Sequence, residues 1–369
     1  MNNLLYLLLK KSKLNKLVYK LRKHSCHEVV AVNAENVALA EELLNSLSKD
    51  SQNSCLALNH ISDNLPYDLQ IIIPAYNVEK YIKECLESVL MQQTSFSYIV
   101  KVINDGSTDG TERVLERYKH FPNIHIISQK NRGFSGARNT GLESIDARYV
   151  MFLDSDDKLM HGAIQRLLET AQQTGADIVE GGHIKFLGSI VTKKCRHTDM
   201  AVANAGVLFG FAWGKVYKSE MFACVKFPEG YWFEDTLCSL VLHPMSNKVS
   251  TISHYVYAYR TNFNGISRTF RGNPKTLDSF YICKQLLQDM KEMNLLTDGD
   301  CAEKIASQFR LNSRRIASLK REDVNKALFI LQCHLFRKMF PNRTKEPSLL
   351  VQTLLDGDYK AFKLQTTLL

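Results

Sequence analysis

The sequence predicts an α/β protein with a Rossmann-like, mainly parallel sheet that carries helices on both faces. From Leu69 onward, short apolar segments alternate with amphipathic segments of about 10–15 residues, which is the pattern of βαβ units. The clusters with the most chemical character directly follow the apolar segments, where such sheets bind ligands. Before and after this region the pattern is helical, so we expect a helical N-terminal extension and a helical C-terminal region.

In chain order we expect the following elements: strand 69–73 ended by Pro74, helix 78–91 capped by Asn77, strand 98–103, helix 111–120, strand 124–127, helix 135–144, strand 149–153, helix 161–174 and strand 177–179. After residue 182 the alternation weakens. We expect a helix over 235–242, a strand over 253–260 and several basic amphipathic helices within 274–340.

A further helix is expected over 33–49, followed by a polar stretch over 50–68 that contains Pro66 and reads as a linker. We therefore divide the chain into three regions. Residues 1–66 form a basic arm, a helix and a linker, residues 67–270 form the α/β domain, and residues 271–369 form a helical region.

The composition is that of a folded globular chain. Of 369 residues, 45% are hydrophobic and 23% are charged, which excludes a disordered or low-complexity protein. No apolar run reaches the ~18 residues of a membrane-spanning helix. The basic residues follow the apolar segment 4–9, the wrong order for a secretory signal, and the nine cysteines form no CxxC pair. We therefore expect a cytoplasmic protein with reduced thiols.

The net charge of +9 is concentrated at the two ends of the chain. Residues 1–27 carry +7 with no acidic residue, and residues 260–345 carry +9. The first segment also has leucines at helical spacing, which is typical of a helix lying on an anionic membrane surface. A solvated arm whose leucines pack on the next helix is the alternative. The first interpretation would place the protein peripherally on the inner face of a membrane.

Three carboxylates, Asp154, Asp156 and Asp157, follow an apolar strand within four residues. Such crowding raises carboxylate pKa values unless a cation neutralises it, and oxygen ligands suit Mg²⁺ or Mn²⁺. The alternative is a polar turn that caps the next helix. We favour the metal because the cluster lies at the end of a buried strand.

Two further clusters suit a phosphorylated ligand. Asp105, within Asn104–Asp109, follows the second strand and is placed to hold a base or ribose, although the segment could only cap a helix. Arg138 lies in a glycine-containing helix start that suits a diphosphate. This segment is neither a Walker A nor a GxGxxG motif. Downstream, Glu234 and Asp235 precede a helix, and Asp235 is either its N-cap or a general base.

The order of these motifs resembles family 2 of the inverting glycosyltransferases over about residues 69–268. The motifs are PAYNVEKY from Pro74, NDGSTDG from Asn104, NRGFSGARN from Asn131, FLDSDD from Phe152, and WGKVY, FPEG, ED and YAYR further on. The resemblance implies a GT-A fold and a metal-dependent hexosyl transfer from a nucleotide-sugar donor, with a UDP-sugar expected. The implied acceptor is a glycan or a lipid-linked glycan in the synthesis of surface polysaccharide, such as lipopolysaccharide or capsule.

The resemblance also implies residue roles. Pro74, Tyr76 and Glu79 would line the nucleotide pocket, Asp105 would hold the base, and Arg138 would lie near the ribose or diphosphate. Asp154 and Asp156 would form a DxD motif, with Asp156 or Asp157 contacting Mn²⁺ or Mg²⁺. Asp235 would be the base with Glu234 in reserve, Arg260 would close over the diphosphate, and Trp213 and Lys215 would lie on the acceptor side.

Two other functions remain open from the sequence. A sugar nucleotidyltransferase uses a similar sheet and a metal, but a glycine-rich loop would then replace Pro74–Asn77 after the first strand. A non-catalytic basic protein could bind a membrane or nucleic acid on the same fold. Nucleic acid is disfavoured as a partner because the intact acidic clusters would repel a phosphate backbone.

Overall fold

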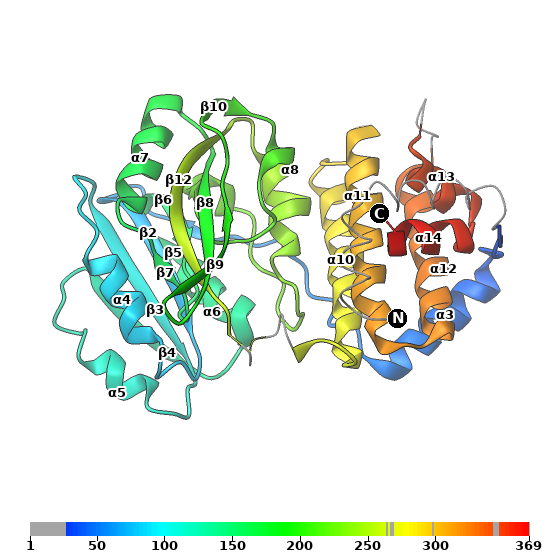
Figure 1. Ribbon diagram of the computed structural model, residues 1–369, viewed down its shortest axis with the longest axis horizontal. Helices are drawn as coiled ribbons and strands as arrows, with labels where there is room; N and C mark the ends of the chain where they lie inside the picture. Colours follow the sequence, from blue (N-terminus) through cyan, green and yellow to red (C-terminus); the bar gives the residue numbers. More distant parts are fainter. Residues whose placement is uncertain (1–26, 263–264, 266–268, 297–298, 342–346, 369) are drawn as a thin grey trace. The chain divides into compact units, whose positions relative to one another are not determined.

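The computed structural model describes residues 27–262, 265, 269–296, 299–341 and 347–368 (Figure 1). The predicted membrane-binding leucines and lysines of the N-terminal segment lie outside these residues. By its internal contacts the chain divides into two units. One unit spans 53–265, and the other combines the residues before 53 with those after 265. We describe each unit separately.

Within its described residues, unit 53–265 is built on a ten-stranded mixed sheet with the order β10-β12-β8-β11-β6-β2-β3-β4, where β7 pairs with β12 and β9 with β8. The strands are β2 (Tyr67–Ala75), β3 (Tyr98–Asp105), β4 (Ile124–Gln129), β6 (Ala147–Phe152), β7 (Lys158–Leu159), β8 (Ile178–Leu187), β9 (Ile190–Cys195), β10 (Met200–Ala203), β11 (Lys215–Lys218) and β12 (Val249–Arg260). Strands β6, β2, β3 and β4 are parallel, β12 is parallel to β8, and β11 runs antiparallel between β6 and β8.

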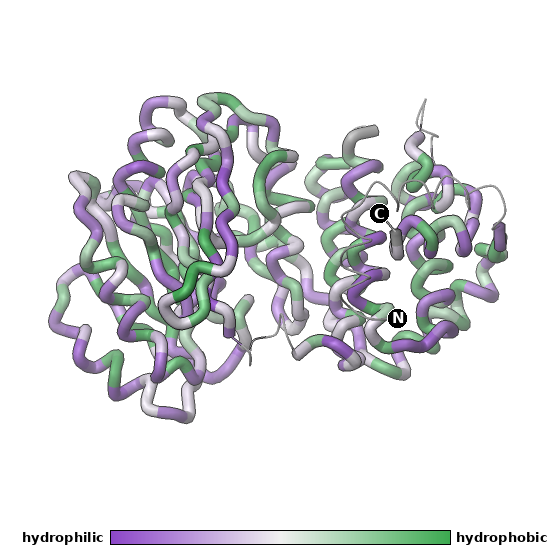
Figure 2. Tube along the Cα trace, in the orientation of Figure 1, coloured by the Kyte–Doolittle hydropathy of each residue, from purple (hydrophilic) through white to green (hydrophobic). Residues whose placement is uncertain are grey.

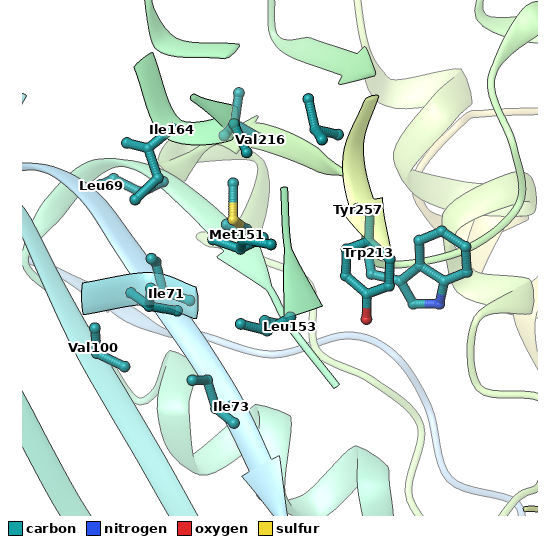
Figure 3. Packing of buried hydrophobic residues seen from close by; sticks show 14 of the residues in the cluster. Leu69, Ile71, Ile73, Val100, Met151, Leu153, Ile164, Trp213, Val216 and Tyr257 are labelled. Carbon is teal, nitrogen blue, oxygen red and sulfur yellow. The ribbon is translucent and has the colours of Figure 1, made fainter. Parts of the chain in front are cut away.

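Helices cover both faces of this sheet, as the sequence predicts. They are α4 (Ile82–Leu90), α5 (Thr111–Glu116), α6 (Gly133–Leu142) and α7 (Ala163–Thr174). Ile71 and Ile73 of β2 belong to an apolar cluster that includes residues of α4 and α7 (Figure 3). Ile72 points to the other face, where a Cβ on Gly141 of α6 would come within 2.5 Å of its side chain. The glycine therefore lets α6 pack directly on the sheet.

Two local predictions at the end of β2 are wrong. Pro74 does not end the strand, since β2 continues to Ala75 and Pro74 pairs with Ile103 of β3. On the other side β6 pairs with β2 only as far as Ile72, so the proline falls where one neighbour has already ended. Asn77 does not cap a helix, because α4 begins at Ile82. Its backbone is left-handed with φ of 51°, and its Oδ1 accepts a hydrogen bond from the Thr108 N–H at 2.8 Å.

The region after residue 182 contains strands that the sequence analysis missed. Strand β8 continues to Leu187, and β9 and β10 follow it. β9 pairs along one edge with β8 and is almost entirely exposed, so no apolar alternation marks it in the sequence. The predicted strand 253–260 is present and begins earlier, at Val249.

The second unit is helical, as predicted for both ends of the chain. It contains α3 (Ala34–Leu47), α10 (Asp278–Glu292), α11 (Gly299–Ile316), α12 (Glu322–Met339), α13 (Leu349–Asp356) and α14 (Tyr359–Leu368). The Asn33 side chain caps α3 by accepting the Asn36 N–H at 2.8 Å. α3 packs on α12, and fully buried Leu44 and Phe309 belong to the core of this unit.

The polar stretch after residue 52 belongs to the sheet unit, so the contacts place this boundary earlier than position 66. The Ala57 N–H donates to the Cys224 carbonyl at 3.1 Å, and the Asn59 Nδ2 donates to the Phe222 carbonyl at 2.7 Å. Strand β1 (His60–Ile61) also pairs with β5 (Ser144–Ile145). Most of the groups in these bonds belong to the backbone, and a polar sequence does not reveal them. Among the described helices, none has the length and apolar character to cross a bilayer.

Candidate active site

Three of the predicted clusters meet at one edge of the sheet. β2 pairs in parallel with β3 on one side and with β6 on the other, so the carboxyl ends of all three strands face the same way. Tyr76 follows β2, Asp105 ends β3, and Asp154 lies two residues after β6. This edge is where open α/β sheets bind ligands.

Asp105 is fixed from three directions. It is 2% exposed, and its Oδ1 accepts hydrogen bonds from Gln129 Nε2 at 2.7 Å and from the Arg132 N–H at 2.8 Å. Its carbonyl accepts a third bond from Asn131 Nδ2 at 3.0 Å. Gly106 has φ of +71°, and a Cβ there would lie 2.9 Å from the Asn131 nitrogen. The carboxylate is thus held rigidly with its Oδ1 occupied.

The residues after β2 differ in their exposure. Pro74 is buried within the strand, and Tyr76 is 47% exposed at its end. Glu79 contacts the loop after β3, because its Oε2 accepts the Gly110 N–H at 3.1 Å and its Oε1 pairs with Arg113 Nη2 at 3.0 Å. Glu79 therefore supports the loop that follows Asp105.

Arg138 joins two of the acidic motifs. Its Nη2 donates to Asp154 Oδ1 at 2.8 Å, and its Nη1 donates to Glu234 Oε1 at 2.6 Å. The side chain is 3% exposed, and its guanidinium carbon lies 5.2 Å from the centre of the Phe227 ring. Burial lowers the pKa of Arg138, but the two carboxylates outweigh it, so the net shift is upward. The pair of bonds fixes the acid after β6 relative to the acid near residue 234.

The three aspartates after β6 have different environments. Asp157 is 1% exposed, and its oxygens accept bonds from the Arg260 N–H at 2.6 Å and the Tyr257 hydroxyl at 2.8 Å. Burial, and then the neighbouring aspartates, raise the pKa of Asp157 well above its ordinary value. Asp156 is partly exposed, and its Oδ2 accepts a bond from Asn262 Nδ2 at 3.0 Å.

This arrangement distinguishes the three predicted metal-site aspartates. Asp157 is 1% exposed and each of its oxygens accepts an internal hydrogen bond, so Asp157 organises the turn and is less open to a metal ion than Asp156. Within the described residues, no three His, Cys, Asp or Glu side chains form a closed metal cage. Mg²⁺ and Mn²⁺ sites that substrate phosphates complete need only one or two carboxylates. Partly exposed Asp156 and Asp154 fit such an open site.

Tyr257 secures this turn from the core side. Its hydroxyl donates to Asp157 and accepts the Asp154 N–H at 3.2 Å. The Tyr257 ring stacks on Trp213 with 4.3 Å between ring centres (Figure 3). Trp213 in turn stacks on Phe211 at 4.4 Å. Trp213 is 6% exposed between the two rings. The stack therefore holds the aspartate turn in place, and Trp213 contributes to this support.

Arg260 lies beside the same turn. Its Nε donates to the Asp156 carbonyl at 2.7 Å, and its Nη2 pairs with Glu84 at 3.0 Å. The guanidinium carbon lies 5.0 Å from the Tyr81 ring centre and 4.7 Å from that of Phe186. These contacts place a cation next to the partly exposed Asp156.

Glu234 and Asp235 are adjacent in sequence but lie in different surroundings. Glu234 is 15% exposed and bound to Arg138, whereas Asp235 is partly exposed and directly precedes a helical segment that starts at 236. The preceding Phe233 has φ of 66°, an unusual value for an aromatic residue. The helix that follows contains a π-helical stretch over Cys238–Leu242. Backbone irregularities of both kinds concentrate at functional sites.

One group of contacts escaped the sequence analysis. Asn139 exchanges two hydrogen bonds with the backbone of Phe227, at 2.9 Å and 2.8 Å. Arg132 forms a bidentate pair with Glu229 at 2.6 Å and 3.2 Å. These contacts attach the segment before Asp235 to α6. In the sequence, only the opposite charges of Arg132 and Glu229, which lie in two separate motifs, could have indicated these contacts.

Lys215 does not lie on an exposed acceptor surface, which corrects its predicted place. Its side chain is fully buried, and its ammonium pairs with Glu180 at 2.6 Å and donates to the Phe209 carbonyl at 2.6 Å. Glu180 also accepts bonds from His197 Nε2 and the Phe209 N–H, both at 2.8 Å. The buried lysine is tolerated because three further hydrogen-bonding groups satisfy the Lys215–Glu180 pair.

The buried pair gives a stability prediction. Lys215→Met should lower the free energy of unfolding by about 3–5 kcal/mol, because it leaves the Glu180 carboxylate charged and buried. Urea unfolding measures this loss. The double variant Glu180→Gln/Lys215→Met should recover part of it, giving a non-zero coupling energy. If the losses of Lys215→Met and Glu180→Gln simply added up to that of the double variant, the coupling energy would be zero, and this would contradict the pairing.

Comparisons with known proteins agree with this geometry. Residues 70–224 match the sequence model described as glycosyl transferase family 2. The chain is 31% identical over 221 residues to glycosyltransferase GlyA of Streptococcus pneumoniae, a match that covers 55% of this chain and 32% of that protein. It is 32% identical over 216 residues to the uncharacterized glycosyltransferase EpsJ of Bacillus subtilis, covering 54% of this chain and 62% of the relative.

The fold is also found in a solved structure. The crystal structure of S. aureus TarS 1-349 in complex with UDP-GlcNAc superimposes with a TM-score of 0.50 at 17% identity, covering 72% of this chain and 91% of that one. This likeness concerns the fold, and it confirms the GT-A fold that the sequence predicts. The matches to the first curated relatives span between about a third and under two thirds of those proteins' lengths.

Proposed function

Because residues 70–224 belong to glycosyl transferase family 2, we propose that this chain transfers a sugar from a nucleoside-diphosphate donor to a hydroxyl group of a glycan or lipid-linked acceptor. The observation that carries the proposal is the meeting of three strand ends, with Asp105, Asp154 and Asp156, beside two arginines. A UDP-sugar is the donor to test first, and a bacterial surface polysaccharide is the proposed product.

The nucleoside end of the donor is assigned to the carboxyl end of β3. Asp105 has its Oδ1 held by Gln129 and the Arg132 N–H, which leaves the carboxylate rigid and oriented. A fixed acceptor of this kind suits an N–H of a base. The half-exposed ring of Tyr76 lies after the neighbouring strand and would line the same pocket with Pro74.

The diphosphate end is assigned to the aspartate turn. Asp156, with Asp154, would hold Mg²⁺ or Mn²⁺, while Arg260 lies beside Asp156. When bound, the cation would neutralise charge that develops on the leaving nucleoside diphosphate. Arg138 keeps Asp154 in place through its bond to Oδ1, and it balances the charge of Glu234.

The acceptor is activated at Asp235. Its carboxylate removes the proton from the acceptor hydroxyl, whose oxygen attacks the anomeric carbon from the face opposite the diphosphate. A carbon–oxygen bond forms as the bond to the diphosphate breaks, so a single displacement inverts the anomeric configuration. Glu234 is the poorer candidate for the base because its Oε1 already accepts a bond from Arg138 at 2.6 Å.

Nucleotide binding tests this assignment without turnover. Asp105→Asn should weaken UDP binding on the order of tenfold, since it removes a charged acceptor while keeping a side chain of the same size. Isothermal titration calorimetry measures the dissociation constant. Asp63→Asn, at an exposed position of the same unit, is the matched control. Unchanged UDP affinity in Asp105→Asn would remove Asp105 from the donor site.

A further inference from the structure

The turn between β8 and β9 exposes three neighbouring aliphatic side chains. Leu187 is 43% exposed, Ile190 68% and Val191 45%. Gly188, with φ of +58°, allows the tight turn between them. Figure 2 shows hydrophobic residues at this turn and hydrophilic ones along the following part of β9. Single exposed aliphatic residues are ordinary, but a group of them at one exposed hairpin turn needs a reason.

All the charged residues in the stem of this hairpin are basic. Residues 181–198 contain Lys185, Lys193, Lys194 and Arg196 and no acidic residue. Lys193 lies directly opposite Lys185 in the β8–β9 register, and like charges in this position destabilise a sheet. Among the described residues, neither Lys193 nor Lys194 forms an ion pair. An anionic partner would relieve this repulsion.

The hairpin turn adjoins the candidate active site. Phe186, the residue before Leu187, lies under the cations of Arg260 at 4.7 Å and Lys158 at 4.8 Å. Its carbonyl accepts the Thr261 N–H at 2.8 Å, and it pairs with Arg260 in the β8–β12 register. A surface that receives the hairpin turn would therefore lie next to the aspartate turn.

We propose that this hairpin docks on an anionic phospholipid surface. Leu187, Ile190 and Val191 enter the interface between headgroups and acyl chains, and the lysines of the stem bind the lipid headgroups. An apolar tip combined with a basic stem matches this partner in both respects. A soluble polyanion would use the lysines alone, and it would leave the aliphatic residues exposed. The docking does not depend on the proposed transfer reaction, so vesicle binding tests it independently.

Vesicle co-sedimentation of the full chain measures the docking. The vesicles contain either phosphatidylcholine alone or phosphatidylcholine with an equal share of phosphatidylglycerol. Lys193→Gln/Lys194→Gln should weaken partitioning to the anionic vesicles roughly thirtyfold, since each of the two lysines near such a surface contributes about 1 kcal/mol. Leu187→Ser/Ile190→Ser should weaken it on a similar scale, because it removes the inserted apolar surface.

Matched controls separate the hairpin from the rest of the chain, including the basic N-terminal segment. Val202→Ser changes an aliphatic residue on β10 that is 65% exposed, close to the 68% of Ile190. Lys83→Gln/Lys119→Gln removes the same charge from α4 and from the segment after α5. Both controls should bind anionic vesicles within about twofold of the wild type, the loss expected for nonspecific charge at a distance from the surface.

Two results would overturn the proposal. Hairpin variants that bind anionic vesicles as tightly as their controls would remove the membrane contact. Loss of binding in the lysine variant alone, with full competition by soluble polyphosphate, would assign the stem to a soluble polyanion. In a second measurement, Ile190→Trp should gain a fluorescence component that shifts to shorter wavelength and is quenched by brominated lipid. An unquenched spectrum at saturating anionic vesicles would contradict insertion.

Discussion

Asp235→Asn should lower turnover by a factor of about 10²–10⁴ and leave the melting temperature near that of the wild type. Asparagine has nearly the same size as aspartate and caps a helix about as well, so the turn that leads into the helical segment starting at 236 should keep its structure. Asparagine cannot accept the acceptor's proton, so the chemical step loses its base. Steady-state kinetics with saturating donor, combined with calorimetric UDP titration, should show collapsed turnover with retained nucleotide binding.

Glu234→Gln is the matched comparison for this experiment. Glu234 is bound to Arg138, so its substitution should disturb a buried charge pair and lower the melting temperature. The residual activity should exceed that of Asp235→Asn. Full turnover in Asp235→Asn, with collapse in Glu234→Gln at normal melting temperature, would move the base to Glu234.

Asp156→Ala should reduce turnover on the order of 10³-fold or more, and excess chelator should abolish the activity of the wild type. A divalent ion at a leaving diphosphate contributes several kcal/mol of transition-state stabilisation, and partly exposed Asp156 is proposed to hold it together with Asp154. Turnover measured across a Mn²⁺ titration gives both effects. Full activity in chelator would show that the reaction needs no divalent ion.

A binding experiment separates metal loss from general damage at this position. Mn²⁺ should strengthen UDP binding to the wild type, as measured by calorimetry, and should have little effect on UDP binding to Asp156→Ala. Asp156→Asn serves as the milder variant, because its amide oxygen can still accept the bond from Asn262. Equal strengthening by Mn²⁺ in all three proteins would place the ion elsewhere.

The sheet and the positions of its acidic ends could be predicted because they follow from local pattern. Apolar segments alternating with amphipathic ones specify parallel strands, and the strand ends specify where Asp105 and Asp154 emerge. The last residue of strand β2 could not be predicted in this way. Proline usually ends a strand, and the sequence does not show that β6 stops pairing at Ile72, which makes Pro74 tolerable.

The roles of single side chains show the same difference between what a local pattern predicts and what only the folded structure shows. Asp157 and Asp156 are indistinguishable as neighbours in a motif, but one faces Tyr257 from the core and the other faces outward. Lys215 is a hydrophilic residue in a motif, and only the position of Glu180 on the adjacent β8 shows why it is buried. Contacts between residues far apart in sequence decide these roles, and a single sequence does not contain them.

The central claim is that the chain releases a nucleoside diphosphate as it transfers a sugar. The most direct measurement incubates the protein with a panel of UDP- and GDP-sugars and Mn²⁺, and follows the products by ³¹P nuclear magnetic resonance. The account predicts release of nucleoside diphosphate from one donor, and loss of that release in Asp156→Ala. Release of pyrophosphate, or binding of nucleic acid without release from any donor, would contradict it.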